Sequence, residues 1–290
     1  MNRPSRALQL LREHPELAQL AAYPFNFDLM RAEHVEAVRL ASGAPIEPIA
    51  GDDTGGTYFV CADGAVLYAG SEGEAGLIGD SVEEALEVLI GLPGWHDYTH
   101  LRPDMDDTAL IEAITQTESE LGEYYGPELH GDRTALLVAL GLSQPPGQEL
   151  IRRLHGALLR TEPDHLLLNA DEDCAYRLLD TLPRPSLRQL VLEHAAPGGE
   201  TPTDGGDLHW AGLARRQGRT ELARCALLRM LDCGPRDAAL LGGLAEELTL
   251  LGDIRQAARA QHLYASLQDD PEKRRTAHDV LAALRQRSER

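Results

Sequence analysis

The sequence predicts an α+β fold, with a small antiparallel sheet packed with helices and an all-α helical-repeat region after it. Three observations support this prediction: apolar residues at helical spacing near the N-terminus, short β-branched and aromatic runs separated by turn residues, and a repeat in the C-terminal region. The chain has 290 residues, of which 43% are hydrophobic. This is enough for about two domains with a substantial core.

Two helices are expected at the N-terminus. Apolar side chains recur at near-helical spacing within residues 5–22, and Pro24 ends the pattern because proline disrupts a helix interior. A second run with this spacing covers Asp28–Leu40. The apolar positions of the two runs are Leu8, Leu11, Leu17, Leu20 and Ala21, then Met30, Val35, Val38 and Leu40.

A meander of about three antiparallel strands is predicted next. The strand candidates are Ile46–Ala50, Thr57–Cys61 and Ala65–Ala69, and Asp63-Gly64 between the last two is a strong hairpin signal. The stretch Ser71–Asp80 is expected to be a glycine-rich loop. Its glycines do not predict a nucleotide site, because no Gly-Lys-Ser/Thr sequence follows and two glutamates would repel phosphate. The residues concerned are Gly70, Gly73 and Gly76, with Glu72 and Glu74.

Further helices follow this region. Ser81 and Glu84 have the spacing of a capping box, so Ser81 is expected to begin a helix that stops at Gly91-Leu-Pro93. Asp106 is expected to cap another helix. The remaining helix candidates are Asp106–Tyr125, Thr134–Leu142 and Gln148–Arg160, whereas Leu166–Leu168 and Tyr176–Leu179 are short apolar runs of undetermined type.

The C-terminal region contains a repeat. Gly218–Ala223 is followed 34 positions later by Gly252–Ala257, and this is the period of the tetratricopeptide repeat. We predict two degenerate helix-turn-helix repeats and a capping helix over Lys273–Gln286, with a plain helical bundle as the alternative. The matched small and apolar positions are Trp210 with Leu244, Ala211 with Ala245, and Ala223 with Ala257.

Two stretches rich in proline and glycine are expected to separate domains. They are Gln144–Gly147 and Ala195–Gly206. The predicted organisation is an acidic α+β domain over residues 1–143, a helical or irregular connector over 144–204, and the helical repeats over 205–290.

The negative charge is concentrated in one part of the chain. The chain has 47 acidic and 27 basic residues, which gives a formal charge of −20. The segment Leu40–Asp132 contains 20 of the acidic residues and a single basic residue, Arg102. So acidic a segment repels phosphate backbones and anionic lipid, which argues against binding of nucleic acid or membrane. It favours a basic protein partner, with solubility alone as the alternative.

The expected location is the cytoplasm. No apolar run approaches the length of a membrane span, and charged residues interrupt the N-terminal segment where a secretory signal would be apolar. The four cysteines form no C-x-x-C pair, so buried thiols in a reducing compartment are expected.

No catalytic residue, metal ligand or cofactor site stands out. His96 and His100 are four apart but lie between Pro93 and Pro103, so surface histidines are expected there and Trp95 is expected to anchor the core. The acids near Asp104 and near Asp171 lack the glycine and terminal glutamate of a calcium loop. No Gly-x-Ser-x-Gly motif is present.

The block at residues 28–95 resembles a known family. The block is similar to the SUKH superfamily, which includes yeast cell-wall regulators and bacterial immunity proteins. The similarity lies in the order of its parts: a helix, the sequence Pro-Ile-x-x-Ile-Ala-Gly-Asp-x-x-Gly-Gly-x-Tyr-Phe, a hairpin, and a helix with the sequence Ser-x-x-Glu-Ala-Leu. The residues that carry the resemblance are Pro48, Ile49, Ala50, Gly51, Asp52, Gly55, Gly56, Tyr58 and Phe59, with the helix Ser81–Leu89. The resemblance implies a non-enzymatic α+β binding domain that blocks a toxin, often a nuclease.

Roles can be assigned within this block. Asp52 is expected to hold the Gly51–Gly56 turn through its side chain, and Tyr58 and Phe59 are expected to alternate, with one facing the core. Partner binding is expected at exposed acids and two aromatic anchors. These candidates are Asp53, Asp63, Glu72 and Glu74, with Trp95 and Tyr98.

The leading hypothesis is therefore a bacterial, cytoplasmic immunity-type protein that neutralises a basic toxin through an acidic face. The competing hypothesis is a housekeeping scaffold or adaptor that recruits partners through its repeat tail. A third is an enzyme with an unrecognised site. The sequence does not give the oligomeric state or the partner.

Overall fold

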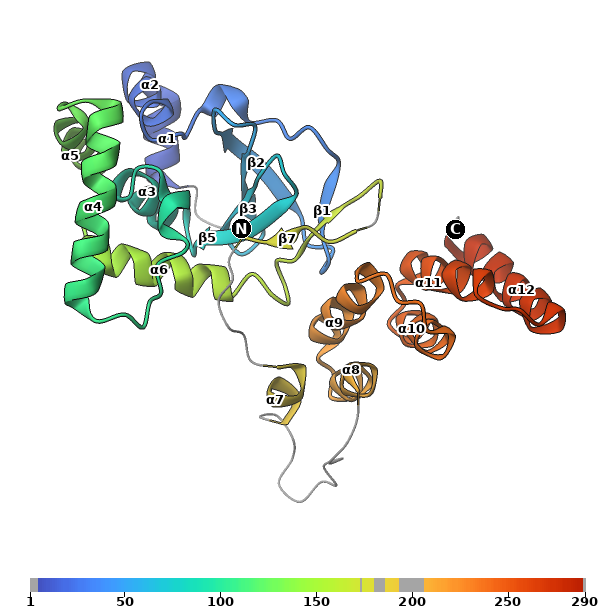
Figure 1. Cartoon of the computed structure of the whole chain (residues 1–290). Helices are drawn as coiled ribbons and strands as arrows, with labels where there is room; N and C mark the ends of the chain where they lie inside the picture. Colours follow the sequence, from blue (N-terminus) through green and yellow to red (C-terminus); the bar gives the residue numbers. More distant parts are fainter. Residues whose placement is uncertain (1–4, 173, 180–185, 193–205, 289–290) are drawn as a thin grey trace. The chain divides into compact units, whose positions relative to one another are not determined.

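The computed structural model describes residues 5–172, 174–179, 186–192 and 206–288. The chain forms two compact units: unit 1 comprises residues 1–171 and 176–183, and unit 2 comprises residues 172–175 and 184–290 (Figure 1). Unit 1 combines helices and sheets, and the described part of unit 2 is helical. The predicted α+β class with a helical C-terminal region is confirmed.

The main sheet of unit 1 has five strands, not about three. Its strands are β2 (Ile46–Gly51), β3 (Thr57–Cys61), β4 (Val66–Ala69), β5 (Glu74–Gly79) and β7 (Arg177–Leu178), in that spatial order. Neighbours among the first four run antiparallel, and β7 pairs in parallel with β5.

The prediction of a loop over Ser71–Asp80 is wrong, because this stretch contains strand β5. The Gly70 N–H donates to the Glu74 carbonyl at 2.8 Å, and Gly73 has φ +79°, a value that favours glycine. The glycines therefore form a tight hairpin turn, and the residues after it pair with β4. The predicted hairpin at Asp63-Gly64 is confirmed by the Gly64 N–H to Cys61 carbonyl bond of 2.9 Å.

The predicted helix over Asp28–Leu40 is also wrong. Only Leu29–Arg31 is helical, as the short 3-10 helix η1, and Val38–Leu40 forms strand β1. This strand pairs antiparallel with β6 (Leu167–Asn169) in a separate two-stranded sheet. Pairing with a distant segment and burial of Leu40 override the local helical spacing.

The helices of unit 1 begin and end largely as expected. The run at 5–22 is divided at His14 because Pro15 starts a new helix and has no N–H to continue the first one. The expected caps are confirmed: Ser81 Oγ accepts from the Glu84 N–H, and Asp106 Oδ1 accepts from the N–H groups of Thr108 and Ala109. The elements are α1 (Arg6–Glu13), α2 (Pro15–Ala22), α3 (Val82–Gly91), the 3-10 helix η2 (Trp95–Tyr98), α4 (Asp107–Tyr125), α5 (Leu129–Leu140) and α6 (Gly147–Leu159).

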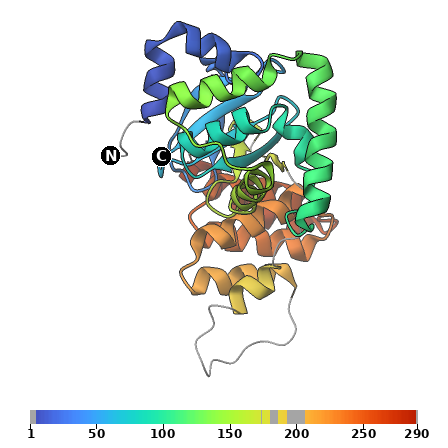
Figure 2. The same ribbon diagram turned by 90° about the vertical axis from the view of Figure 1, so that its left-hand side faces the viewer.

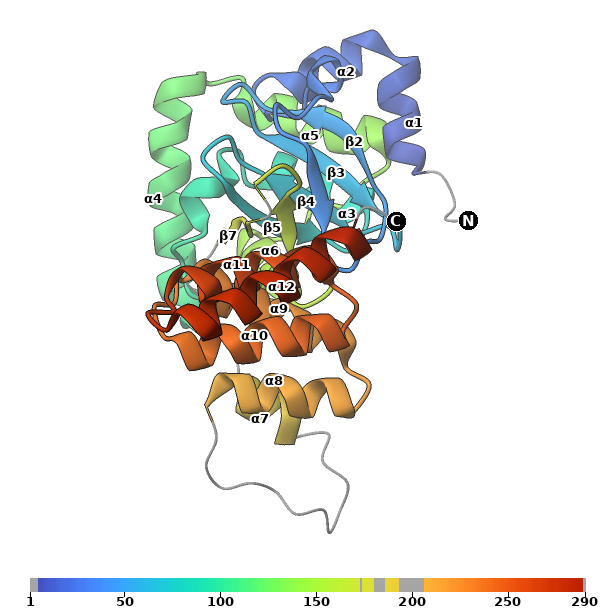
Figure 3. The ribbon, with the colours of Figure 1, turned by 90° about the vertical axis from the view of Figure 1, so that its right-hand side faces the viewer.

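The main sheet is buried on both faces. Helices α1–α6 gather on one side of it (Figures 1 and 3), and Figure 2 views unit 1 from that helical side. Tyr58 and Tyr68 belong to the core shared with these helices, whereas Phe59 and Leu67 belong to a second core that includes residues of β1 and β6. Tyr58 and Phe59 are therefore both buried, on opposite faces of the sheet and in different cores. This corrects the expectation that only one of the two residues faces a core.

The expected domain boundary at Gln144–Gly147 is wrong, and with it the connector over 144–204. Helix α6 directly follows Pro146, and its residues Leu150, Ile151, Leu154 and Leu158 lie in the same core as the sheet. The proline-rich stretch separates two helices of one unit. The second expected boundary, Ala195–Gly206, lies outside the described residues except for Gly206.

Unit 2 contains the predicted helical hairpins. Helices α9 and α11 have the same length, and both begin and end 34 residues apart. Gly218 and Gly252 occupy the turns before them, with φ of +77° and +79°. All six matched repeat positions are buried. The helices are α7 (Leu187–Leu192), α8 (Asp207–Arg216), α9 (Thr220–Asp232), α10 (Ala238–Leu250), α11 (Ile254–Ser266) and the predicted final helix α12 (Pro271–Ser288).

Candidate functional site

The Gly51–Gly56 turn is organised by a buried carboxylate. Asp52 is 2% exposed, and its Oδ1 accepts from the Gly56 N–H at 2.7 Å and from the N–H and hydroxyl of Thr54 at 2.9 Å. Its Oδ2 accepts from the Tyr68 hydroxyl at 2.7 Å. Burial and the adjacent Asp52 raise the pKa of Tyr68 well above its usual range, so this hydroxyl remains a donor. The expected turn-holding role of Asp52 matches this geometry.

Trp95 and Tyr98 are not available as exposed partner anchors. They are 2% and 0% exposed, and the Trp95 ring lies edge-on to Tyr68 with centroids 5.2 Å apart. Gly94, with φ +65°, reverses the chain after α3 and lets η2 pack inward. Their expected binding role is therefore corrected to a core role, and for Trp95 a core role was also one of the expectations.

The four predicted acidic binding residues do not form one site. Asp53 follows the end of β2 and Glu72 precedes the start of β5, and these two turns lie at the same end of the sheet, where Ser71 Oγ donates to the Thr54 carbonyl at 3.0 Å. Glu74 is partly buried and pairs with Arg177 at 3.4 Å. Asp63 lies in the β3–β4 turn, at the opposite end of the meander.

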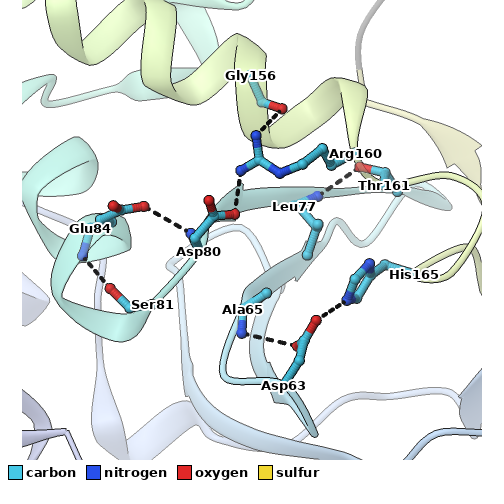
Figure 4. Close-up of polar contacts among 10 residues, drawn as sticks. All are labelled: Asp63, Ala65, Leu77, Asp80, Ser81, Glu84, Gly156, Arg160, Thr161 and His165. Carbon is cyan, nitrogen blue, oxygen red and sulfur yellow. Dashed lines mark hydrogen bonds and ion pairs between the residues drawn. The ribbon is translucent and has the colours of Figure 1, made fainter.

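A few acids of the acidic segment are paired in the folded state with bases outside it. Unit 1 has 30 acidic and 11 basic residues, a net charge of −19. Arginines of α5 and α6, and one just after α6, pair with acids of the segment, as the Arg160–Asp80 pair in Figure 4 shows. The other pairs are Arg133–Glu118, Arg152–Asp107 and Arg153–Glu87. Other acids of the segment have no arginine partner within the described residues.

Two acids, Asp53 and Asp97, lie near a cluster of tyrosines. Tyr125 contacts Tyr23 and Tyr124 edge-on, with ring centroids 5.7 and 4.8 Å apart. Tyr23 is 62% exposed and Tyr124 is 78% exposed. Partial burial, followed by the nearby charges of Asp53 and Asp97, raises the pKa of Tyr125.

Asp97 also lines an adjoining groove. This cavity of about 500 Å³ lies between η2 and α4, and Glu120 contributes from α4. No arginine or lysine within the described residues pairs with Asp53, Asp97 or Glu120. We call this region the acidic tyrosine face, which comprises Tyr23, Asp53, Asp97, Glu120, Tyr124 and Tyr125. His96 and His100 also line the groove and are exposed, as expected.

Asp53 was predicted from the sequence as a binding residue, but none of the tyrosines of this face was. Tyr23 lies between α2 and the strands, and Tyr124 and Tyr125 end α4, so about 100 residues of chain separate them. The Tyr-Tyr pair at the end of an acidic helix was a usable signal, because aromatic residues are scarce in this chain at 4%.

A second cluster has the residue types of a nucleophilic or metal centre. One side-chain atom each from Cys61, Asp63 and His165 lie within 4.8 Å of one another. Burial, with a smaller effect of Asp63, raises the pKa of the Cys61 thiol to about 12. The thiol therefore stays protonated near neutral pH and is a poor nucleophile.

None of the described helices is both long and apolar enough to cross a membrane. Comparison with known proteins gives no match: no family model, no curated protein and no solved structure is significantly similar to the chain. The resemblance to the SUKH superfamily therefore stays a prediction.

Proposed function

We propose that unit 1 is a non-enzymatic binding domain of the immunity type, which neutralises a basic, nuclease-like toxin domain through its acidic tyrosine face. The observation that carries this proposal is the combination of exposed tyrosines with three carboxylates that have no arginine or lysine partner within the described residues. Elsewhere in unit 1, arginines pair with acids such as Asp80 and Asp107.

Both components of the face suit a protein partner. Tyrosines bring large contact area at low cost in conformational entropy and are enriched at energetically important interface positions. Carboxylates complement the basic surface with which a nuclease binds phosphates, and they raise the association rate through long-range attraction. The net charge of −19 on unit 1 strengthens that attraction.

The proposal includes a bacterial, cytoplasmic setting, where an antidote meets its toxin. No disulfide joins the four cysteines, all of which are among the described residues. This supports a reducing compartment.

A charge-matched pair of variants tests the proposal. The face variant carries Asp53→Asn, Asp97→Asn and Glu120→Gln in the full chain. The control variant removes the same charge at exposed acids outside the face, by Glu47→Gln, Glu112→Gln and Asp164→Asn. Proteins captured from the source lysate by the wild-type chain are identified, and their association rates are measured at low and physiological salt.

We expect the captured partner to be basic, and its association rate to fall about tenfold in the face variant and much less in the control. Raising the salt from low to physiological levels should slow association with the wild-type chain. An association rate that does not change with salt, or an equal effect of the two variants, refutes the acidic tyrosine face as the binding site.

A second candidate function, a scaffold acting through unit 2, is favoured by one observation. A groove of about 240 Å³ lies among α10, α11 and α12, with Leu250 and Val280 in its lining at 56% and 45% exposure. Substitution of both by glutamate would block apolar contacts there. A partner lost in this variant but retained by the face variant supports the scaffold function instead.

A further inference from the structure

The cluster of Cys61, Asp63 and His165 brings together three metal-ligating side chains from separate parts of unit 1. Cys61 ends β3, Asp63 lies in the β3–β4 turn, and His165 follows α6, 102 residues after Asp63. One potential ligand atom of each lies within 4.8 Å of the other two. The sequence pattern did not predict these ligands, because their proximity exists only in the folded chain.

The hairpin holds the first two side chains in place. The Cys61 N–H donates to the Ala65 carbonyl at 2.8 Å. Asp63 Oδ1 accepts from the Ala65 N–H at 3.2 Å, while Oδ2 faces His165 Nε2 at 2.9 Å (Figure 4). The carboxylate is therefore oriented toward the imidazole by the turn itself.

The segment that carries His165 is anchored to the sheet from the other side. The Leu77 N–H of β5 donates to Thr161 Oγ1 at 2.9 Å in a buried contact, and Arg160 pairs with Asp80 (Figure 4). The His165 N–H in turn donates to the Thr161 carbonyl at 2.9 Å. Both halves of the cluster are thus positioned before any ion arrives, which lowers the cost of binding one.

The imidazole nitrogen that faces Asp63 is Nε2, and an ion at the cluster would take the place of its 2.9 Å contact with Asp63 Oδ2. His165 Nδ1 is buried and has no hydrogen-bond partner within the described residues. Asp63 is 58% exposed at its side chain, and this exposure gives the cluster access to solvent. An ion at the cluster would therefore have three protein ligands and access to solvent.

We propose that Cys61, Asp63 and His165 bind one divalent cation of the zinc class, with a fourth position open to water. A thiolate, an imidazole and a carboxylate form a donor set that suits zinc, whereas magnesium and calcium take oxygen ligands. On binding, the Cys61 sulfur forms a bond to the metal and its proton passes to the solvent, with no change of oxidation state. This site is independent of the acidic tyrosine face, which lies at the other end of the meander.

Cobalt(II) titration of the full chain, freed of metal by a chelator, tests the site. Cobalt replaces zinc in such sites and absorbs in the near ultraviolet when a thiolate binds it. We expect one cobalt ion per chain, a thiolate-to-cobalt band, and loss of that band when zinc is added. Cys61→Ser should abolish the band, and Asp63→Asn and His165→Gln should each weaken binding more than about tenfold, since loss of even an outer partner costs that much.

Cys233→Ser is the matched control, because Cys233 is exposed and lies in unit 2. It should leave the band and the affinity unchanged. Asp63→Asn and His165→Gln alter a turn and a loop, so they test the site even where Cys61→Ser lowers stability; circular dichroism checks that each variant is folded. Absence of the band in the wild-type chain, or its persistence in folded Cys61→Ser, overturns the proposal.

Discussion

Replacing Asp52 by alanine should destabilise unit 1 strongly. This carboxylate is 2% exposed and accepts hydrogen bonds from the Gly56 N–H, the Tyr68 hydroxyl, and both donors of Thr54. Alanine removes all of these acceptors at once. Thr54 is exposed, so water can replace the lost contacts there, but Gly56 and Tyr68 are buried and would be left with unsatisfied donors.

The magnitude follows from these two buried donors. Each buried group that loses its partner costs about 1–3 kcal/mol, so the expected loss for the two donors is about 2–6 kcal/mol. That is a large share of the roughly 5–15 kcal/mol by which a domain is stable. Asp52→Asn keeps the Oδ1 acceptor for Gly56 and offers an N–H to the Tyr68 oxygen, so it should cost less, about 1–2 kcal/mol.

Urea unfolding followed by tryptophan fluorescence measures this loss. Trp95 lies against Tyr68 in unit 1, and the second tryptophan, Trp210, belongs to unit 2. A Trp210→Phe background therefore makes the signal specific to unit 1. With a slope of about 2 kcal/mol per molar urea, Asp52→Ala should lower the midpoint by about 2 M.

Asp53→Ala is the control for this series. Asp53 is the exposed neighbour of Asp52, so its replacement should change stability by less than about 0.5 kcal/mol. The free energy of unfolding of Asp52→Ala could instead lie within about 1 kcal/mol of that of the control, which is roughly the lower limit for one lost buried partner. The cost of desolvating the buried carboxylate would then offset its hydrogen bonds. The inference that Asp52 organises the turn energetically would then be refuted.

Three further predictions concern the units, a turn and a histidine. A chain that ends at residue 183 should unfold cooperatively, with the same urea midpoint of Trp95 fluorescence as the full chain, because residue 183 is the last residue of unit 1. A clearly lower midpoint would show that unit 2 stabilises unit 1. Gly252→Ala should cost unit 2 about 1 kcal/mol in thermal unfolding, since φ is +79° while the space around the glycine is open; an unchanged midpoint would contradict this conformational reason. Burial lowers the pKa of His34, against the opposing effect of Glu36, so the unfolded chain binds more protons just below about pH 6.5 and stability should fall as pH drops through that range. His34→Gln should reduce this dependence in urea titrations at several pH values, and an identical profile for both proteins would show that other groups cause it.

Local patterns predicted the elements that depend on local interactions. Ser81 and Asp106 cap their helices as expected, because a cap requires only a side chain and the N–H groups two or three residues later. The hairpin at Asp63-Gly64 and the repeat turns at Gly218 and Gly252 were likewise readable from residues whose backbone preferences are strong.

Elements that depend on distant partners were not readable. Residues 38–40 have helical spacing but form a strand, because β6 supplies its hydrogen bonds from more than 100 residues away. The glycines at Gly70–Gly73 predicted a loop in place of β5, and this strand is stable because it pairs with β4 and β7. Periodicity describes one segment, whereas strand pairing is a property of two.

The charge of −20 and its concentration in one region follow from the sequence alone, since ionisable residues can be counted without coordinates. The location of available charge does not. Folding brings arginines of α5 and α6 onto several of those acids and leaves Asp53, Asp97 and Glu120 beside exposed tyrosines. It also brings Cys61 and His165 together. Composition thus determined the sign of the charge on this part of the chain, and tertiary structure decided which acids remain without an arginine partner among the described residues, because electrostatic attraction depends on distance in space, not on position along the chain.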